Sequence, residues 1–162
     1  MKMASLSVSI QSEDFDIGQE HQALRAQDER VGAVCSFLGT VRSQSDGQAV
    51  SAMALEHYPG MTEKAIMAML TQAQDKFDIH AARVIHRIGD LMPGDQIVWV
   101  GVTSAHRGQS FQACEFLIDY LKTQAPFWKK EQTPNGARWV DARVSDDDAL
   151  SRWGIEVPRQ AI

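Results

Sequence analysis

Apolar and polar positions recur along the chain in blocks that predict an α+β fold. Residues 5–11 alternate leucine, valine and isoleucine with serine, a pattern typical of a half-buried strand. Apolar residues at helical spacing predict three helices, over residues 17–28, from Thr62 to about Phe77, and between Ser104 and Pro126. Further strands are expected over residues 31–41, 49–58, 82–91, 97–103, 127–132 and 138–142.

Turn signals between these strands predict three hairpins. The signals are the polar segment 43–48, the Met-Pro-Gly-Asp turn at 92–95 and Pro-Asn-Gly at 134–136. Helices that alternate with hairpins indicate two or three helices packed on a mostly antiparallel sheet. We expect one domain over residues 1–144. Residues 145–162 turn acidic and polar, and a short helix to Trp153 and a mobile tail both remain open for them.

The third predicted helix carries most of the candidate chemistry. Ser104 has the side chain of an N-cap, which would place His106 and Arg107 in a first turn that attracts anions. Lys122 lies at the edge of the apolar face, so its stem can be covered while its amine reaches a cleft. We expect these groups to meet Lys129 and Lys130 at one end of the helix. The expected core face is Phe111, Cys114, Leu117, Ile118 and Leu121.

Charge and cysteine usage narrow the function classes. A formal net charge of −5 argues against general nucleic-acid binding, which needs a broad basic face, but leaves room for a small basic pocket. Cys35 and Cys114 lie far apart in apolar runs, so we expect buried free thiols and a cytoplasmic protein. A reactive persulfide would need a more accessible thiol. No apolar run is long enough to span a membrane.

Several residues could bind an anion or move a proton. Arg42 and Arg143 each follow a predicted strand, where a planar guanidinium suits an oxyanion, although a surface arginine that closes a strand remains the alternative. Lys122 and Lys129 are the candidates for proton transfer, because a part-buried amine beside other cations gives up its proton more readily. Nucleotide signatures and metal-ligand spacings are absent, so we expect no cofactor and no metal.

Several segments together resemble one family. They are F-L-G-T-V-R (37–42), L-E-H-Y-P-G-M-T-E-K-A (55–65), H-R-I-G (86–89), P-G-D (93–95), V-G-V-T-S-A-H-R (100–107) and D-Y-L-K-T-Q-A-P-F-W-K-K-E (119–131). Over residues 30–143, in the correct order, the chain resembles the catalytic large subunit of molybdopterin synthase. The resemblance implies a hammerhead-like α/β arrangement and a single catalytic domain.

The resemblance also implies an activity and its partners. The family inserts two sulfurs into cyclic pyranopterin monophosphate to form the dithiolene of molybdopterin. Sulfur arrives as a C-terminal Gly-Gly thiocarboxylate on a small ubiquitin-like subunit, and two large subunits form a dimer within a heterotetramer. By the same resemblance Lys122 and Lys129 are catalytic. The implied substrate-binding residues are Phe37, Thr40, Val41, Arg42, His106, Arg107, Lys130, Glu131 and, less securely aligned, Arg143.

The residues alone are also compatible with two other functions. A scaffold could grip a ubiquitin-like tail without catalysis and would not need His106 or Lys129. An enzyme acting on phosphate esters could use the same basic pocket without sulfur. Only a synthase would form molybdopterin from the pterin precursor and a thiocarboxylated partner, so this reaction distinguishes it from the scaffold and from the phosphate-ester enzyme.

Overall fold

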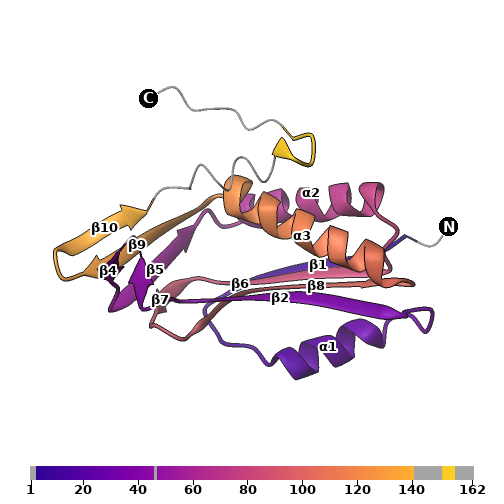
Figure 1. The fold of residues 1–162 in the computed structure, drawn as a ribbon, viewed down its shortest axis with the longest axis horizontal. Helices are drawn as coiled ribbons and strands as arrows, with labels where there is room; N and C mark the ends of the chain where they lie inside the picture. Colours follow the sequence, from indigo (N-terminus) through magenta and orange to yellow (C-terminus); the bar gives the residue numbers. More distant parts are fainter. Residues whose placement is uncertain (1–2, 46, 141–150, 156–162) are drawn as a thin grey trace.

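The computed structural model describes residues 3–45, 47–140 and 151–155, and these form an α+β fold (Figure 1). The main sheet has the order β1-β6-β8-β2, and its strands are β1 (Ser5–Gln11), β6 (Ala81–Arg87), β8 (Gln96–Ser104) and β2 (Ala33–Thr40). The end sheet has the order β10-β9-β5-β7, with strands β10 (Gly136–Val140), β9 (Phe127–Thr133), β5 (Ala52–His57) and β7 (Gly89–Leu91). A two-stranded ribbon adds β3 (Gln44–Ser45) and β4 (Gln48–Ala49).

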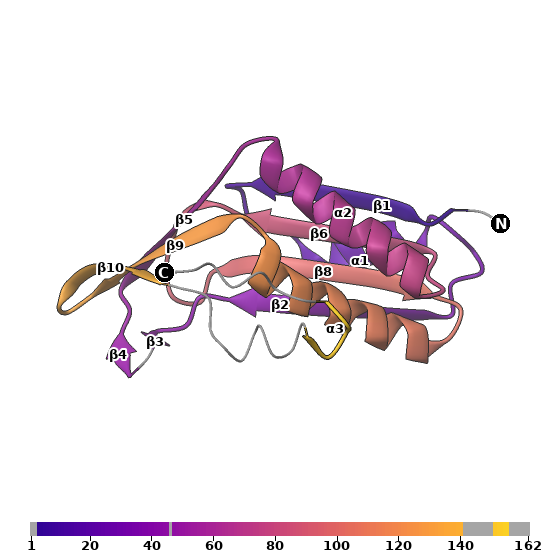
Figure 2. The ribbon, with the colours of Figure 1, turned by 90° about the horizontal axis from the view of Figure 1, so that it is seen from above.

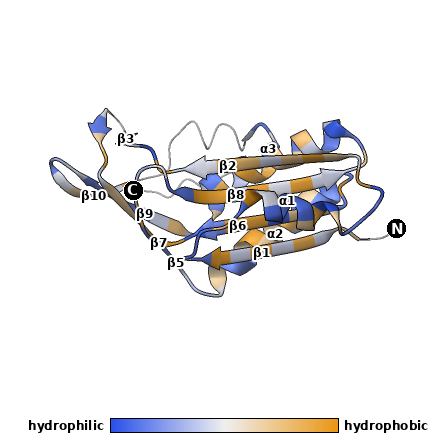
Figure 3. Cartoon of the chain, turned by 90° about the horizontal axis from the view of Figure 1, so that it is seen from below, coloured by the Kyte–Doolittle hydropathy of each residue, from blue (hydrophilic) through white to orange (hydrophobic). Residues whose placement is uncertain are grey.

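Helices cover both faces of the main sheet. Helix α1 (Ile17–Arg25) lies on one face, and α2 (Met61–Lys76) and α3 (Arg107–Gln124) lie side by side on the other (Figures 1 and 2). Alternation along β6 fills both layers, because Ala82 and Val84 join the core under α2 and α3 while Ala81 and Ile85 pack toward α1. Hydrophobic residues accordingly occur on all four strands of the main sheet (Figure 3). The predicted α+β class is confirmed.

One predicted hairpin is wrong. Residues 31–41 and 49–58 do form strands, but β2 pairs antiparallel with β8 and β5 pairs with β7 and β9, in different sheets. Burial decides the pairing: β2 carries Cys35 and Phe37 to the core under α3, whereas β5 carries Met53 and Leu55 to a separate core. The loop between them therefore crosses from one sheet to the other.

The predicted strand over residues 82–91 also changes sheets. It divides into β6 and β7, and Gly89 at the start of β7 has φ +83°, a conformation that glycine adopts without a steric penalty. The predicted turn at 92–95 then returns the chain to β8, which pairs with β6. The two sheets consequently meet near the ends of β6 and β2.

Helix starts and the core face of α3 differ in detail from prediction. His106, not Ser104, is the N-cap of α3, because the buried Ser104 hydroxyl donates to the His106 carbonyl instead of capping the helix. Gly60 precedes α2, and its N–H donates to the Glu63 carboxylate at 2.6 Å. Phe111 is 60% exposed, and Phe116 is the buried phenylalanine of α3.

Residues 151–155 pack on the helices. The Trp153 ring makes edge contacts with Phe77 and Phe116, at centroid distances of 5.9 and 5.7 Å. Its indole N–H donates to Asp119 at 2.6 Å, and Arg152 also donates to that carboxylate. This part of the expected tail is thus held against α2 and α3.

Candidate active site

A cavity of about 490 Å³ opens where the two sheets meet the C-terminal end of α3. Cavities of this size commonly hold small ligands. Its floor is apolar, from Met53, Leu55, Ile97 and Leu121, and four charged or titratable side chains face it. These four are Arg42, His86, Lys122 and Lys129.

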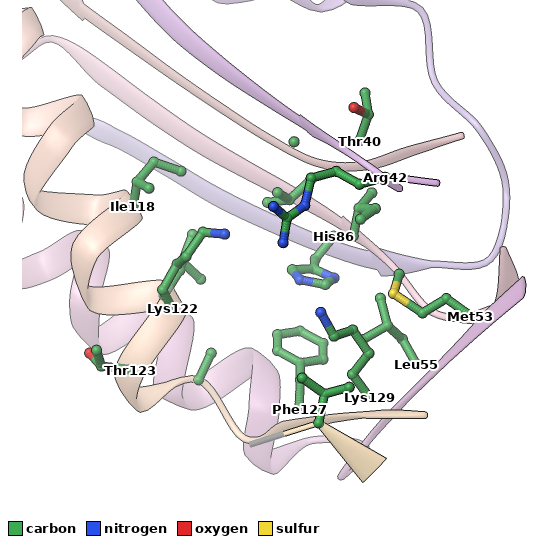
Figure 4. Close-up of a pocket in the computed structure, with 16 residues that line it drawn as sticks. Thr40, Arg42, Met53, Leu55, His86, Ile118, Lys122, Thr123, Phe127 and Lys129 are labelled. Carbon is green, nitrogen blue, oxygen red and sulfur yellow. The ribbon is translucent and has the colours of Figure 1, made fainter. Parts of the chain in front are cut away.

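Three cations point into one space. Figure 4 shows the side chains of Arg42, Lys122 and Lys129 directed toward the region around the His86 ring. We call these three residues the cationic cluster. Such a group of fixed positive charges suits a phosphate or a carboxylate-like anion.

Local structure explains where each cation lies. Arg42 follows β2, and the preceding residue is fixed on both sides: Val41 N–H donates to Asp95, and Gly94 N–H donates to Val41, at 2.9 and 2.8 Å. Pro126 disfavours a helical conformation for Ala125, which has ψ 132°, so α3 ends and β9 starts within three residues. Lys122 in the last turn and Lys129 in the strand consequently approach the same cavity.

Arg42 and Lys122 differ in their partners from three arginines elsewhere in the described residues. Arg30, Arg83 and Arg152 each donate to a carboxylate at 2.7 to 3.1 Å. Arg42 and Lys122 have no ion pair with any carboxylate in the described ranges. Positive charge without a protein counter-charge favours an external anion at this site.

His86 also lines the cavity, although the sequence did not indicate it as a site residue. Its ring stacks on Phe127 with centroids 3.8 Å apart, and its Nδ1 lies 2.8 Å from the Arg87 carbonyl oxygen. Burial, reinforced by the charge of Lys122, lowers the pKa of His86 to about 4, so the ring is neutral near pH 7. Alternation along the strand could have found it, because His86 follows Ala82 and Val84 on the same face.

His106 and Arg107 do not join this cavity within one chain. They are exposed at the start of α3, and Lys122 follows Arg107 by fifteen residues of helix, about 22 Å at 1.5 Å per residue. The expectation that all the cations meet at one end of the helix is therefore wrong. The cavity forms at the C-terminal end of α3, where Arg42, Lys122 and Lys129 do come together.

Among the remaining candidates in the described ranges, only Thr40 lines the cavity. Val41 is buried with Met53 and Leu91, and half-buried Phe37 packs against the main core. Glu131 is buried and lies 3.7 Å from Arg138. Lys130 lies over the Trp139 ring at 5.7 Å. Arg143 lies outside the described residues.

The described residues contain no group of three or more histidine, cysteine, aspartate or glutamate side chains placed to hold a metal ion. Both cysteines are free thiols, and burial together with neighbouring Cys35 raises the pKa of the Cys114 thiol. A protonated, buried thiol is a poor nucleophile. Nor does any helix in the described ranges have the length and apolar character to cross a membrane.

Known proteins share this architecture. The profile of the MoaE protein family matches residues 10–124. The chain is 60% identical over 149 residues to the molybdopterin synthase catalytic subunit of Ralstonia nicotianae, which covers 92% of this chain and 85% of that protein. The chain belongs to the MoaE family. It is also 51% identical over 151 residues to the molybdopterin synthase catalytic subunit of Escherichia coli K12, covering 93% of this chain and 100% of that one.

Solved structures of the family agree. The molybdopterin biosynthesis MoaE protein of Burkholderia ambifaria superposes with a TM-score of 0.80 at 52% identity, covering 95% of this chain and 100% of that chain. Molybdopterin synthase from Staphylococcus aureus superposes with a TM-score of 0.72 at 29% identity, covering 87% and 98%. The family assignment therefore rests on the sequence and on the fold.

Proposed function

We propose that the chain is the catalytic subunit of a molybdopterin synthase and converts cyclic pyranopterin monophosphate to molybdopterin. The observation that carries the proposal is the cationic cluster, which gathers Arg42, Lys122 and Lys129 around one small cavity on a protein of net charge −5. A cyclic phosphate and a thiocarboxylate are both anions, so the same charges attract the substrate and the sulfur donor. Relatives at 51 and 60% identity carry the name of this enzyme.

The sulfur donor in this proposal is a second protein. The relatives are named as catalytic subunits, which implies a partner subunit of another kind. We infer a small ubiquitin-like carrier whose C-terminal Gly-Gly thiocarboxylate enters the cavity. The cytoplasm, where free thiols persist, is the expected compartment, and both cysteines here are free.

The mechanism follows from the side chains that face the cavity. The thiocarboxylate sulfur attacks a carbon of the pterin side chain, the bond from that carbon to oxygen breaks, and the oxygen leaves on its phosphate or as water. A thioester then joins carrier and substrate. Water then attacks the thioester carbonyl, the C–S bond breaks, and the carrier leaves as a carboxylate while the sulfur stays on the pterin. Lys122 and Lys129 stabilise the oxyanion and move the protons, and Arg42 holds the phosphate. Neither cysteine takes part, because the carrier supplies the sulfur.

His106 and Arg107 enter the proposal through a second copy of the chain. Their distance from Lys122 along α3 prevents them from reaching the cavity of their own chain. In the expected homodimer, they would contribute positive charge and an N-terminal helix end to the cavity of the partner copy. Each dimer with two carriers then forms a heterotetramer with two sites.

One incubation tests the proposed activity. The purified chain is mixed with thiocarboxylated carrier and cyclic pyranopterin monophosphate, and molybdopterin is measured after oxidation to a fluorescent derivative. The proposal predicts molybdopterin and two molecules of carrier with a free carboxylate for each molybdopterin, because two sulfurs are inserted. Carrier binding without product would instead identify a scaffold. Release of inorganic phosphate without sulfur transfer would identify a phosphate-ester enzyme.

A further inference from the structure

His86 occupies the middle of the cavity for a reason that starts in its strand. Along β6, Ala82 and Val84 lie under α2 and α3, and His86 continues the same row toward the end of the main sheet. Its partner in β8 is Val98, which also lines the cavity. At this position the row reaches the cavity, and the imidazole faces the space between Arg42, Lys122 and Lys129 (Figure 4).

The ring is held in one orientation and one tautomer. Phe127 stacks against it at 3.8 Å with an angle of 16° between the planes. Because the Arg87 carbonyl oxygen can only accept, the 2.8 Å contact requires that Nδ1 carries the hydrogen. In a neutral imidazole, Nε2 then carries a lone pair and no hydrogen.

The surroundings keep the ring neutral. Burial and the positive charge of Lys122 lower the pKa of His86 to about 4, since each disfavours a second positive charge. Among the described contacts none involves Nε2. The cavity therefore combines three cationic donors with a fixed, neutral acceptor.

His86 supplies a hydrogen-bond acceptor, which the cationic cluster lacks. Lysine and arginine can only donate, so they bind the phosphate but cannot accept from N–H or O–H groups of the same substrate. The lining hydroxyls are less suited: Thr123 donates to the Asp119 and Tyr120 carbonyls, and Thr40 is exposed at the rim. His86 Nε2 is the side-chain acceptor best placed to meet a donor on the pterin ring.

We propose that His86 contacts the pterin directly, with Nε2 accepting a hydrogen bond from an N–H or O–H group of the ring system. This assignment rests on the proposed function, which supplies the pterin. A flat heterocycle with a phosphate on one side and N–H donors on the other uses both halves of the cavity. The carrier tail, whose reactive end is an anion, is served by the cationic cluster.

Two substitutions distinguish the role of Nε2 as a hydrogen-bond acceptor from the structural role of the His86 ring. In His86→Asn, the side-chain amide N–H replaces Nδ1–H as the donor to the Arg87 carbonyl, but nothing replaces Nε2. In His86→Gln, the longer amide reaches the position of Nε2, where its oxygen accepts a hydrogen bond. Binding of cyclic pyranopterin monophosphate is measured by fluorescence without carrier, and carrier binding is measured separately by calorimetry.

We expect His86→Asn to weaken pterin binding about tenfold, because a substrate donor loses its partner inside the cavity. His86→Gln is expected to stay within about threefold of the wild type, and carrier affinity to be unchanged in both variants. Equal pterin binding by His86→Asn and the wild type would overturn the assignment. So would equal losses in both variants, or a loss confined to carrier binding.

A measurement on the wild-type protein covers the case in which a variant does not fold. Nitrogen-15 NMR of labelled histidines reports the Nε2 resonance, which must move on addition of the pterin if it accepts a hydrogen bond. If the Nε2 resonance does not shift when the pterin is added, the proposed contact is refuted. Both experiments measure binding and not turnover, so a chain that binds the pterin through His86 yet forms no molybdopterin would contradict only the proposed function.

Discussion

At the scale of single residues, the cavity holds two kinds of titratable side chain, the basic residues Arg42 and Lys122 and the histidine His86. Arg42 and Lys122 have no carboxylate partner in the described ranges, whereas the lowered pKa of His86 between them keeps its ring neutral near pH 7. The same burial that prepares the cavity for an anion makes protonation of His86 unfavourable. This difference can be measured as a dependence of stability on pH.

The free energy of unfolding should fall as the pH drops from 6.5 toward 4. Over this range an unfolded His86 binds a proton and the folded one, with its pKa lowered to about 4, does not, so acid favours the unfolded state. The expected loss from this group is on the order of 3 kcal/mol. Urea unfolding at several pH values measures it.

The His86→Gln variant should lose less stability than the wild type over the same pH range, because it has no such proton to bind. His106→Gln, at an exposed position, serves as the control and should follow the wild type. Parallel curves for His86→Gln and the wild type would show that the pKa of His86 is not lowered in the folded protein.

At the scale of elements, the alternation of side chains along β9 determines which of them face the cavity. Successive side chains of β9 point to opposite faces of the end sheet, so Phe127 and Lys129 face the cavity while Trp128 and Lys130 face away. Trp128 donates to Glu56 at 2.9 Å, and Lys130 lies over Trp139. Two adjacent lysines thus have different surroundings.

Removal of the two lysines should have unequal effects. Lys129→Ala is expected to lower single-turnover molybdopterin formation at least about 100-fold, the scale of a lost acid–base group. Lys130→Ala should lower it much less, since its amine lies on the other face of the strand. Rapid-quench measurements with saturating carrier compare them. Equal losses would mean that β9 presents both lysines to the substrate.

The positions of the helices and strands along the chain were more predictable from the sequence than the pairing of the strands. Alternation and helical spacing located β1, α1, α2, β8 and α3, because these patterns depend on local burial. The pairing of β2 with β8 depends on which core each strand faces, which a local pattern does not contain. The sequence likewise indicated Arg42, Lys122 and Lys129. His106 and Arg107 were expected beside them, but the length of α3 holds them at its other end.

At the scale of the whole molecule, one chain provides an incomplete set of the proposed site residues. The cavity of a chain contains Lys122 and Lys129, while His106 and Arg107 lie at the far end of α3. If a second copy supplies them, two inactive variants can restore one intact site in a mixed dimer. Activity then depends on which residues share a chain.

Co-expression of Lys122→Ala and Arg107→Ala chains should recover about a quarter of wild-type molybdopterin formation, because half of the dimers are mixed and each has one intact site. Lys122→Ala mixed with Lys129→Ala is the matched control and should recover nothing, since those residues serve the same cavity. Mixed dimers isolated by two different tags should show about half of the wild-type activity per dimer, because one of their two sites is intact. Failure of the first mixture would place Arg107 outside the site.

The central claim is that the cationic cluster carries out sulfur transfer, and single-turnover molybdopterin formation by Lys122→Ala tests it most directly. Lys64→Ala is the control, because Lys64 is exposed on α2 and does not line the cavity. The account predicts that Lys122→Ala folds, still binds the carrier, and forms molybdopterin at least about 100-fold more slowly, while Lys64→Ala matches the wild type. A wild-type rate in folded Lys122→Ala would contradict it.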